Sequence, residues 1–144
     1  MSTDTLHKSI FLNASPDVVW EFLIDKDKLG IWFHPAENNL EAGQEYALTS
    51  TNSDGNTDKI CWGKVLEMDP PNRLVTTFVI KPLGTNESTL VWTLESVHGG
   101  TRLSLEHSGL AKASGDSPLP LLMAIDAGWD KHFGKLRETV PVAA

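Results

Sequence analysis

The stretch SPLPLLMAIDAGWDKHFGKLRETV, residues 117–140, decides the fold because its pattern predicts one long helix that needs a sheet to cover it. A serine–proline pair opens the stretch. Serine caps free backbone N–H groups, and proline fits the first helical position. The residues of the predicted inner face recur at spacings of one, three and four. They are Leu121, Leu122, Ile125, Trp129, His132, Phe133, Leu136 and Val140. About 22 residues make a helix roughly 33 Å long, which crosses most of a sheet in so small a protein.

The residues between 44 and 109 show the pattern that is typical of short strands separated by turns. Strands are expected over residues 44–50, 59–68, 74–80, 88–97 and 101–108. Asp69-Pro70-Pro71-Asn72 predicts a turn, since neither proline can donate to a strand ladder. His98-Gly99-Gly100 predicts a tight hairpin between the last two strands. We therefore expect five consecutive strands that pair in antiparallel fashion.

The amino-terminal part adds one strand and two short helices to this pattern. Residues 5–13 are expected as a strand, and Ser15-Pro16 begins a helix whose buried stripe includes Trp20 and Phe22. A second helix is expected over residues 26–32, ending before Pro35. The predicted class is thus α+β, with strands and helices in separate parts of the chain.

Composition narrows the kinds of partner that the protein can have. The chain has 144 residues and a mass of 15.8 kDa, which suits a single domain over residues 1–144 with its core at about 6–140. Its formal charge of −7 disfavours nucleic acid and anionic membranes as partners. Cys61 is the single cysteine, and the start of the sequence is polar, so a reducing cytoplasm is expected. A monomer and a homodimer are both compatible with the sequence.

Four motifs resemble those of a known superfamily. They are IFLNASPDVVW at residues 10–20, GKVLEMDPPNRL at 63–74, GTRLSLEHSGL at 100–110, and Gly128-Trp129 followed by Leu136. Together they resemble the START-like, birch-pollen-allergen-like SRPBCC superfamily, and within it the branch of activator of heat-shock-protein-ninety ATPase homologue-like proteins. The resemblance implies a helix-grip fold, in which a curved antiparallel sheet of about six strands wraps around a long carboxy-terminal helix. Superfamily members include lipid carriers, hormone receptors, polyketide cyclases and chaperone activators, so the resemblance implies the fold more narrowly than the function.

Strand alternation predicts which side chains face the long helix. The expected inward sets are Leu74, Thr76 and Phe78; Leu90, Trp92 and Leu94; and Leu103, Leu105 and His107. On the strand at 59–68, Trp62 and Val65 both favour burial but have opposite parity, which predicts a β-bulge.

Aromatic side chains from the sheet and the helix are expected to converge, and the candidate ligand site lies there. The candidates are Trp32, Phe33, Phe78, Trp92, Leu105, His107, Trp129, His132 and Phe133. Core packing explains such a cluster, and so does a cavity for a hydrophobic or amphipathic small molecule. The imidazole of His107, like that of His132, either contacts a ligand or is a buried group satisfied within the protein. His34 is expected at the rim or on the surface.

Catalytic and metal-binding patterns are missing from the sequence. No nucleophile elbow, phosphate loop or zinc-ligand spacing is present, so we expect no metal and no cofactor. Cys61 is expected to be a buried apolar group. Asp126 and Asp130 are four residues apart and are expected on a solvated helix face rather than as an acid–base pair.

Three functions remain open on this evidence. The first is a small-molecule binding protein that holds a ligand between the sheet and the helix. The second is a chaperone-ATPase activator-like interaction module, implied by the resemblance. The third is a cyclase, dehydratase or hydrolase that uses the same cavity, with His107 as its candidate acid or base.

Overall fold

The computed structural model describes residues 5–80, 87–110 and 118–140, and the predicted fold class is confirmed within them. The elements are β1 (Leu6–Leu12), α1 (Pro16–Ile24), α2 (Lys26–Trp32), β2 (Glu45–Thr51), β3 (Thr57–Asp69), β4 (Arg73–Ile80), β5 (Ser88–Val97), β6 (Gly100–Ser108) and α4 (Pro118–Thr139). Ser117, the expected cap of α4, lies outside the described residues.

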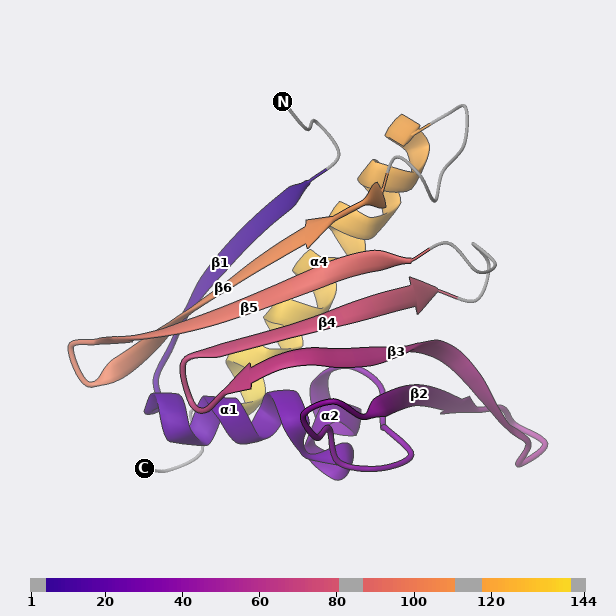
Figure 1. Ribbon diagram of the computed structural model, residues 1–144, viewed down its shortest axis with the longest axis horizontal. Helices are drawn as coiled ribbons and strands as arrows, with labels where there is room; N and C mark the ends of the chain where they lie inside the picture. The colour runs from indigo at the N-terminus through magenta and orange to yellow at the C-terminus, as the bar shows by residue number, and fades with distance from the viewer. Residues whose placement is uncertain (1–4, 81–86, 111–117, 141–144) are drawn as a thin grey trace.

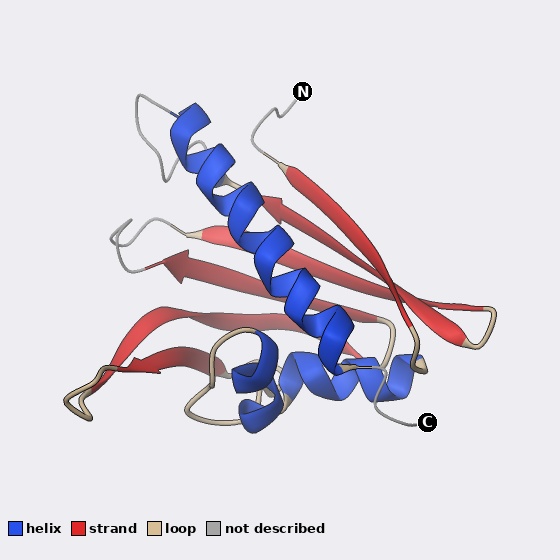
Figure 2. Ribbon diagram, turned by 180° about the vertical axis from the view of Figure 1, so that it is seen from behind, coloured by secondary structure: helices blue, strands red, loops and turns tan. Residues whose placement is uncertain are grey.

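The strands form one antiparallel sheet in the order β1-β6-β5-β4-β3-β2. Helix α4 runs diagonally across one face of this sheet, and α1 and α2 lie near its carboxy-terminal end (Figures 1 and 2). The 22 residues of α4 match the predicted length. The long helix and the inner face of the sheet therefore enclose the core of the protein.

Local chemistry explains where the two short helices begin. The Ser15 hydroxyl caps α1, and Pro16 occupies its first turn, as the sequence predicts. Asp25 ends α1 and also caps α2, because its Oδ1 accepts hydrogen bonds from the backbone N–H groups of Asp27 and Lys28. The N–H of Lys28 is the main reason that the pKa of Asp25 lies below its usual value.

The predicted hairpin between β5 and β6 is present, but its turn has two residues, because Gly100 belongs to β6 rather than to the turn. His98 and Gly99 have φ angles of 49° and 88°, and Val97 pairs with Gly100. Positive φ at both central residues is the geometry of a type I′ turn, whose twist matches that of the flanking strands. The register of β6 that follows from this turn directs His107 toward α4.

The predicted inward sets of β4, β5 and β6 are all buried. Trp62, by contrast, is only half-buried and faces the outer side of the sheet, so the expectation that it would be buried with Val65 is wrong. Two β-bulges do occur in β3, but one precedes Cys61, in the pairing with β2, and the other follows Val65, in the pairing with β4. The alternation from Cys61 to Val65 is therefore unbroken, and Trp62 points away from both.

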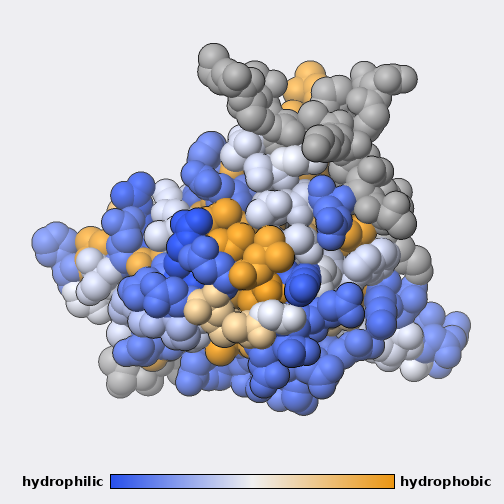
Figure 3. Space-filling view, in the orientation of Figure 1, coloured by the Kyte–Doolittle hydropathy of each residue, from blue (hydrophilic) through white to orange (hydrophobic). Residues whose placement is uncertain are grey.

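The outer face of the sheet is mostly hydrophilic, whereas the exposed side of α4 is mixed. Leu119 and Met123 are exposed near its start, and exposed charged side chains follow from Asp130 onward. Figure 3 shows the molecule from the outer side, where polar side chains surround a small apolar patch. Asp126 and Asp130 have exposed side chains, as predicted, and both contact Lys8 of β1 at 2.6 and 2.7 Å. These contacts connect α4 to the first strand of the sheet.

Candidate functional site

Aromatic side chains meet between α4, α2 and the sheet, as the sequence predicts. The ring centroids of Trp92 and Trp129 are 5.6 Å apart with nearly perpendicular planes. Trp32 lies 6.1 Å from Trp92, and Phe133 of α4 lies 6.0 Å from the same ring. Aromatic pairs favour such edge-to-face and offset arrangements at these distances. Trp92 is thus the point at which the two helices and the sheet meet.

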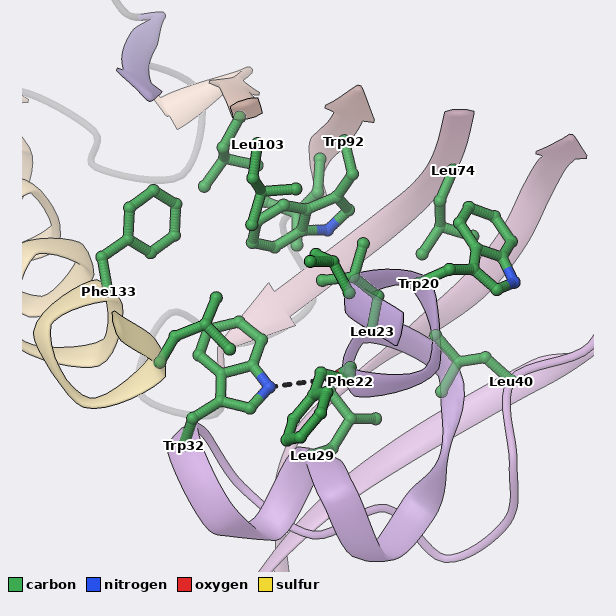
Figure 4. Packing of buried hydrophobic residues seen from close by; sticks show 14 of the residues in the cluster. Trp20, Phe22, Leu23, Leu29, Trp32, Leu40, Leu74, Trp92, Leu103 and Phe133 are labelled. Carbon is green, nitrogen blue, oxygen red and sulfur yellow. Dashed lines mark hydrogen bonds between the residues drawn. The ribbon is translucent and has the colours of Figure 1, made fainter. Parts of the chain in front are cut away.

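The part of the interior beneath α2 is filled. Trp32 is buried there, and its indole N–H donates a hydrogen bond of 2.8 Å to the carbonyl oxygen of Phe22 (Figure 4). The remaining space among Trp32, Tyr46 and Trp92 is about 30 Å³, which is room for one or two water molecules. This region is therefore packed core and leaves no space for an organic ligand.

A larger cavity of about 210 Å³ lies beside α4. Its lining comes from α4, from β3, β4 and β6, and from the residues that follow α2. The lining residues are Phe33, His34, Cys61, Phe78, Ile80, His107, Ala124, Ile125, Gly128, Trp129 and His132. Phe78, Trp129 and His107 are buried and form its inner wall, whereas Phe33, His34 and His132 are half-buried and form its rim. The cavity is thus an apolar, largely aromatic space. The imidazole of His107 lies on its inner wall, and those of His34 and His132 lie on its rim.

His107 on the inner wall has both ring nitrogens occupied. The Trp129 indole N–H donates to Nδ1 at 3.0 Å, and Nε2 lies 2.8 Å from the Ser88 hydroxyl. The Ser88 hydroxyl donates in turn to the carbonyl oxygen of Phe78 at 2.7 Å. An indole can only donate and a carbonyl can only accept, so the proton of His107 lies on Nε2 and points to Ser88. Burial lowers the pKa of His107 to about 4, and the ring is neutral at pH 7.

His34 and His132 face each other across the rim. Their ring centroids are 5.3 Å apart, and each ring also contacts Phe33. Nδ1 of His132 lies 3.3 Å from the carbonyl oxygen of Trp32. Burial is the main cause that lowers the pKa of both imidazoles, and the proximity of His34 lowers that of His132 further. Both rings are therefore predominantly neutral at pH 7.

Cys61 lies in the wall of the cavity as a free, buried thiol, as predicted. Burial raises the pKa of this thiol to about 12, so it stays protonated at neutral pH. In this state its side chain acts as a small apolar surface.

The structure divides the nine candidate residues into two groups. Five line the cavity: Phe33, Phe78, His107, Trp129 and His132. The other four, Trp32, Trp92, Leu105 and Phe133, belong to the packed core. Ile125 and Gly128 of α4 also line the cavity but were not among the candidates. Helical spacing from Trp129 and His132 was the signal that could have identified them, since residues three and four apart share a face.

Within the residues that the structure describes, no cluster of three or more histidine, cysteine, aspartate or glutamate side chains has the arrangement needed to hold a metal ion. In the same part of the chain, no helix has the length and apolar character needed to cross a membrane.

These features define a helix-grip protein with an aromatic cavity beside its carboxy-terminal helix. The chain belongs to the family of activator of Hsp90 ATPase homolog 1-like proteins, whose sequence model matches residues 13–141. This family lies within the SRPBCC superfamily that the four sequence motifs resemble. No protein with a curated description matches the sequence closely enough to count as a relative.

Solved structures share the fold at low sequence identity. DynU16, described as a putative protein in the dynemicin biosynthetic locus, is 22% identical with a TM-score of 0.78, over 98% of this chain and 48% of DynU16. CalU16 from Micromonospora echinospora is 23% identical with a TM-score of 0.71, over 92% of this chain and 73% of CalU16. CV1439 from Chromobacterium violaceum is 20% identical with a TM-score of 0.80, over 99% and 100% of the two chains. The chain spans about half the length of DynU16, and likenesses at these identities establish the fold alone.

Proposed function

We propose that the protein binds a small hydrophobic or amphipathic molecule in the cavity beside α4. The observation that supports this proposal is the 210 Å³ space itself, which remains open next to a core that is otherwise filled. Its walls are aromatic and aliphatic, with a few polar groups, which is the usual composition of a ligand site.

The size of the cavity limits the part of a ligand that lies within it to about one ring with short substituents. An apolar cavity of about 150 Å³ is known to accommodate benzene, and sites for larger, drug-sized molecules begin at about 300 Å³. With a volume of about 210 Å³, this cavity lies between those two cases. A long acyl chain or a multi-ring ligand would extend beyond the rim, on the side where the cavity is open to solvent.

Gly128 provides a direct test of the site. It lines the cavity, and a Cβ added to it meets no atom within 4 Å, so a larger side chain enters the open space rather than the core. Gly134, six residues further along α4, also has nothing within 4 Å of an added Cβ but does not line the cavity. Gly128→Leu and Gly134→Leu are therefore a matched pair on one helix.

The experiment titrates ethylbenzene into the wild type and both variants and follows the Trp129 indole N–H signal by NMR. We expect binding to the wild type and to Gly134→Leu, and binding at least about tenfold weaker to Gly128→Leu, because the leucine side chain fills the space. Absence of ethylbenzene binding to the wild type, or equal binding by all three proteins, would overturn the proposal. Native mass spectrometry of freshly purified protein identifies any small molecule that co-purifies.

The other two functions remain as alternatives. The family description supports chaperone-ATPase activation, and stimulation of the chaperone's ATP turnover by the purified protein is its test. For an enzyme that uses the cavity, His107 is the candidate acid or base, although its nitrogens already contact Trp129 and Ser88. An unchanged turnover in a His107→Ala variant would remove that assignment.

A further inference from the structure

The polar groups of the cavity differ in how much hydrogen-bonding capacity they have left for a ligand. Both nitrogens of His107 are engaged with Trp129 and Ser88, as described above. The Cys61 thiol is protonated and is a weak donor and acceptor at best. Among the described side chains that line the cavity, the imidazoles of His34 and His132 therefore have the main unused capacity.

The backbone fixes the proton position of His132. Its Nδ1 faces the carbonyl oxygen of Trp32, and a carbonyl can only accept a hydrogen bond. In the neutral ring the proton consequently lies on Nδ1, and Nε2 carries a free lone pair. His132 lines the cavity, so Nε2 is the ring nitrogen that it has left to accept a hydrogen bond from a ligand there.

The charges around the cavity disfavour an anionic ligand. Among the described residues no lysine or arginine lines the cavity, and the two rim imidazoles are predominantly neutral at pH 7. The positive charge of Lys131 acts on His132 from the neighbouring position of α4, but its side chain is exposed and is not part of the lining. A carboxylate that entered the cavity would lose water without gaining an opposite charge, which is costly. A neutral hydroxyl has no such penalty, and a phenol with a pKa of about 10 is neutral at physiological pH.

We propose that the cavity selects a neutral, single-ring hydroxyl compound, such as a substituted phenol, whose O–H donates a hydrogen bond to Nε2 of His132. The ring of the ligand packs against the aromatic wall formed by Phe33, Phe78 and Trp129. This inference rests on the proposed ligand-binding function and names the chemical class of the ligand. In this proposal His132 determines the preference for a hydroxyl compound, and packing against the apolar wall contributes most of the binding affinity.

The test compares 4-ethylphenol with 4-ethyltoluene, in which a methyl group of similar size replaces the hydroxyl. The dissociation constants of both are measured by NMR or calorimetry for the wild type, His132→Phe, His132→Gln and His34→Phe. The ratio of the two constants cancels contributions that the ligands share, such as burial of the ring.

We expect the preference for the phenol over 4-ethyltoluene to fall by about fivefold or more in His132→Phe, which keeps an aromatic ring but loses the acceptor. His132→Gln restores an acceptor near the position of Nε2 and should recover part of the preference. His34→Phe retains Nε2 of His132 and should keep the wild-type ratio. In the wild type, 4-ethylbenzoate should bind more weakly than the phenol.

The outcomes separate this inference from the proposed function. If neither uncharged ligand binds the wild type, both proposals fail. If both bind but the ratio is unchanged in His132→Phe, or falls instead in His34→Phe, the cavity binds ligands and the assignment to His132 is overturned. Tighter binding of 4-ethylbenzoate than of the phenol also overturns the assignment, because a neutral acceptor does not favour a carboxylate. Circular dichroism of each variant checks that the fold is intact.

Discussion

The indole N–H of Trp129 donates a hydrogen bond of 3.0 Å to Nδ1 of His107, and this contact connects helix α4 to strand β6. Both residues are buried, and Nε2 of His107 continues the chain of hydrogen bonds through Ser88 to the carbonyl oxygen of Phe78. Trp129 donates to His107, His107 donates to Ser88, and Ser88 donates to the carbonyl oxygen of Phe78. Since the indole can only donate and the carbonyl can only accept, every hydrogen bond in the network has a fixed direction. This network adds directional contacts to the apolar packing that holds α4 against the sheet beside the cavity.

Ser88→Ala should destabilise the protein by about 1–3 kcal/mol. The change removes little volume but leaves the Nε2–H of His107 and the carbonyl oxygen of Phe78 without their partner in a buried site. The free energy of unfolding from urea denaturation is the measurement. Ser96→Ala is the matched control, because Ser96 lies on the same strand with an exposed side chain and should change stability by less than about 0.5 kcal/mol. Equal stability of the two variants would show that the network contributes nothing.

Stability should decrease as the pH falls from 6.5 toward 4. Burial lowers the pKa of His107 from 6.5 to about 4, so in this window the unfolded chain binds a proton that the folded protein excludes. The stabilisation is complete above pH 6.5 and is lost progressively as the pH approaches 4, by up to about 3 kcal/mol. Unfolding free energies measured at several pH values between 7 and 4.5 test this dependence.

His107→Gln isolates the contribution of His107 to that slope. Burial also lowers the pKa values of His34 and His132, so a variant without His107 should retain part of the pH dependence. The variant will be less stable at pH 7, but its stability should change less between pH 6.5 and 4.5 than that of the wild type. A slope identical to that of the wild type would mean that His107 titrates normally and is not enclosed as the structure has it.

Local chemistry made most of the fold predictable. Several elements could be predicted from only a few neighbouring residues, and the structure contains each of them. They are the helix start at Ser15-Pro16, the hairpin between β5 and β6, and the buried alternation of Leu103, Leu105 and His107. Trp62 was misplaced because its size suggested burial, whereas strand parity, which depends on where the bulge falls, sets its direction. Parity is a property of the pairing between β3 and β4, and β3 alone does not reveal it.

The candidate site was less predictable than the fold. The convergence of Trp92 and Trp129 followed from amphipathic patterns, but the division between packed core and cavity did not. That division depends on how tightly side chains from separate elements fit together, which periodicity does not report. The same holds for the partners of His107, because Ser88 lies on a neighbouring strand that the sequence places 19 residues away.

Replacing either of two glycines by alanine should change the stability of the protein, in opposite directions. A Cβ on Gly63 would lie 2.0 Å from the carbonyl oxygen of Thr77, so Gly63→Ala forces β3 and β4 apart and should cost at least about 2 kcal/mol. Gly134 lies within α4 with no atom near an added Cβ, so Gly134→Ala should stabilise the protein by about 0.5–1 kcal/mol through helix propensity. Thermal and urea unfolding of the two variants measure both signs, and a stable Gly63→Ala protein would contradict the close approach of the strands.

Cys61 should be almost inert toward alkylation while the protein is folded. Its thiol is buried in the cavity wall with a pKa of about 12, compared with an ordinary value of 9.0, so the thiolate fraction at pH 8 falls by about a thousandfold. Labelling by iodoacetamide at pH 8, followed by mass spectrometry, should therefore be slow for the native protein and fast for the same protein in urea, which serves as the control. A ligand in the cavity would slow native labelling further, because it stabilises the folded state and covers the wall that contains the thiol. Rapid labelling of the native protein would instead show that the Cys61 thiol is exposed to water often enough to ionise, and that it is less buried than the structure indicates.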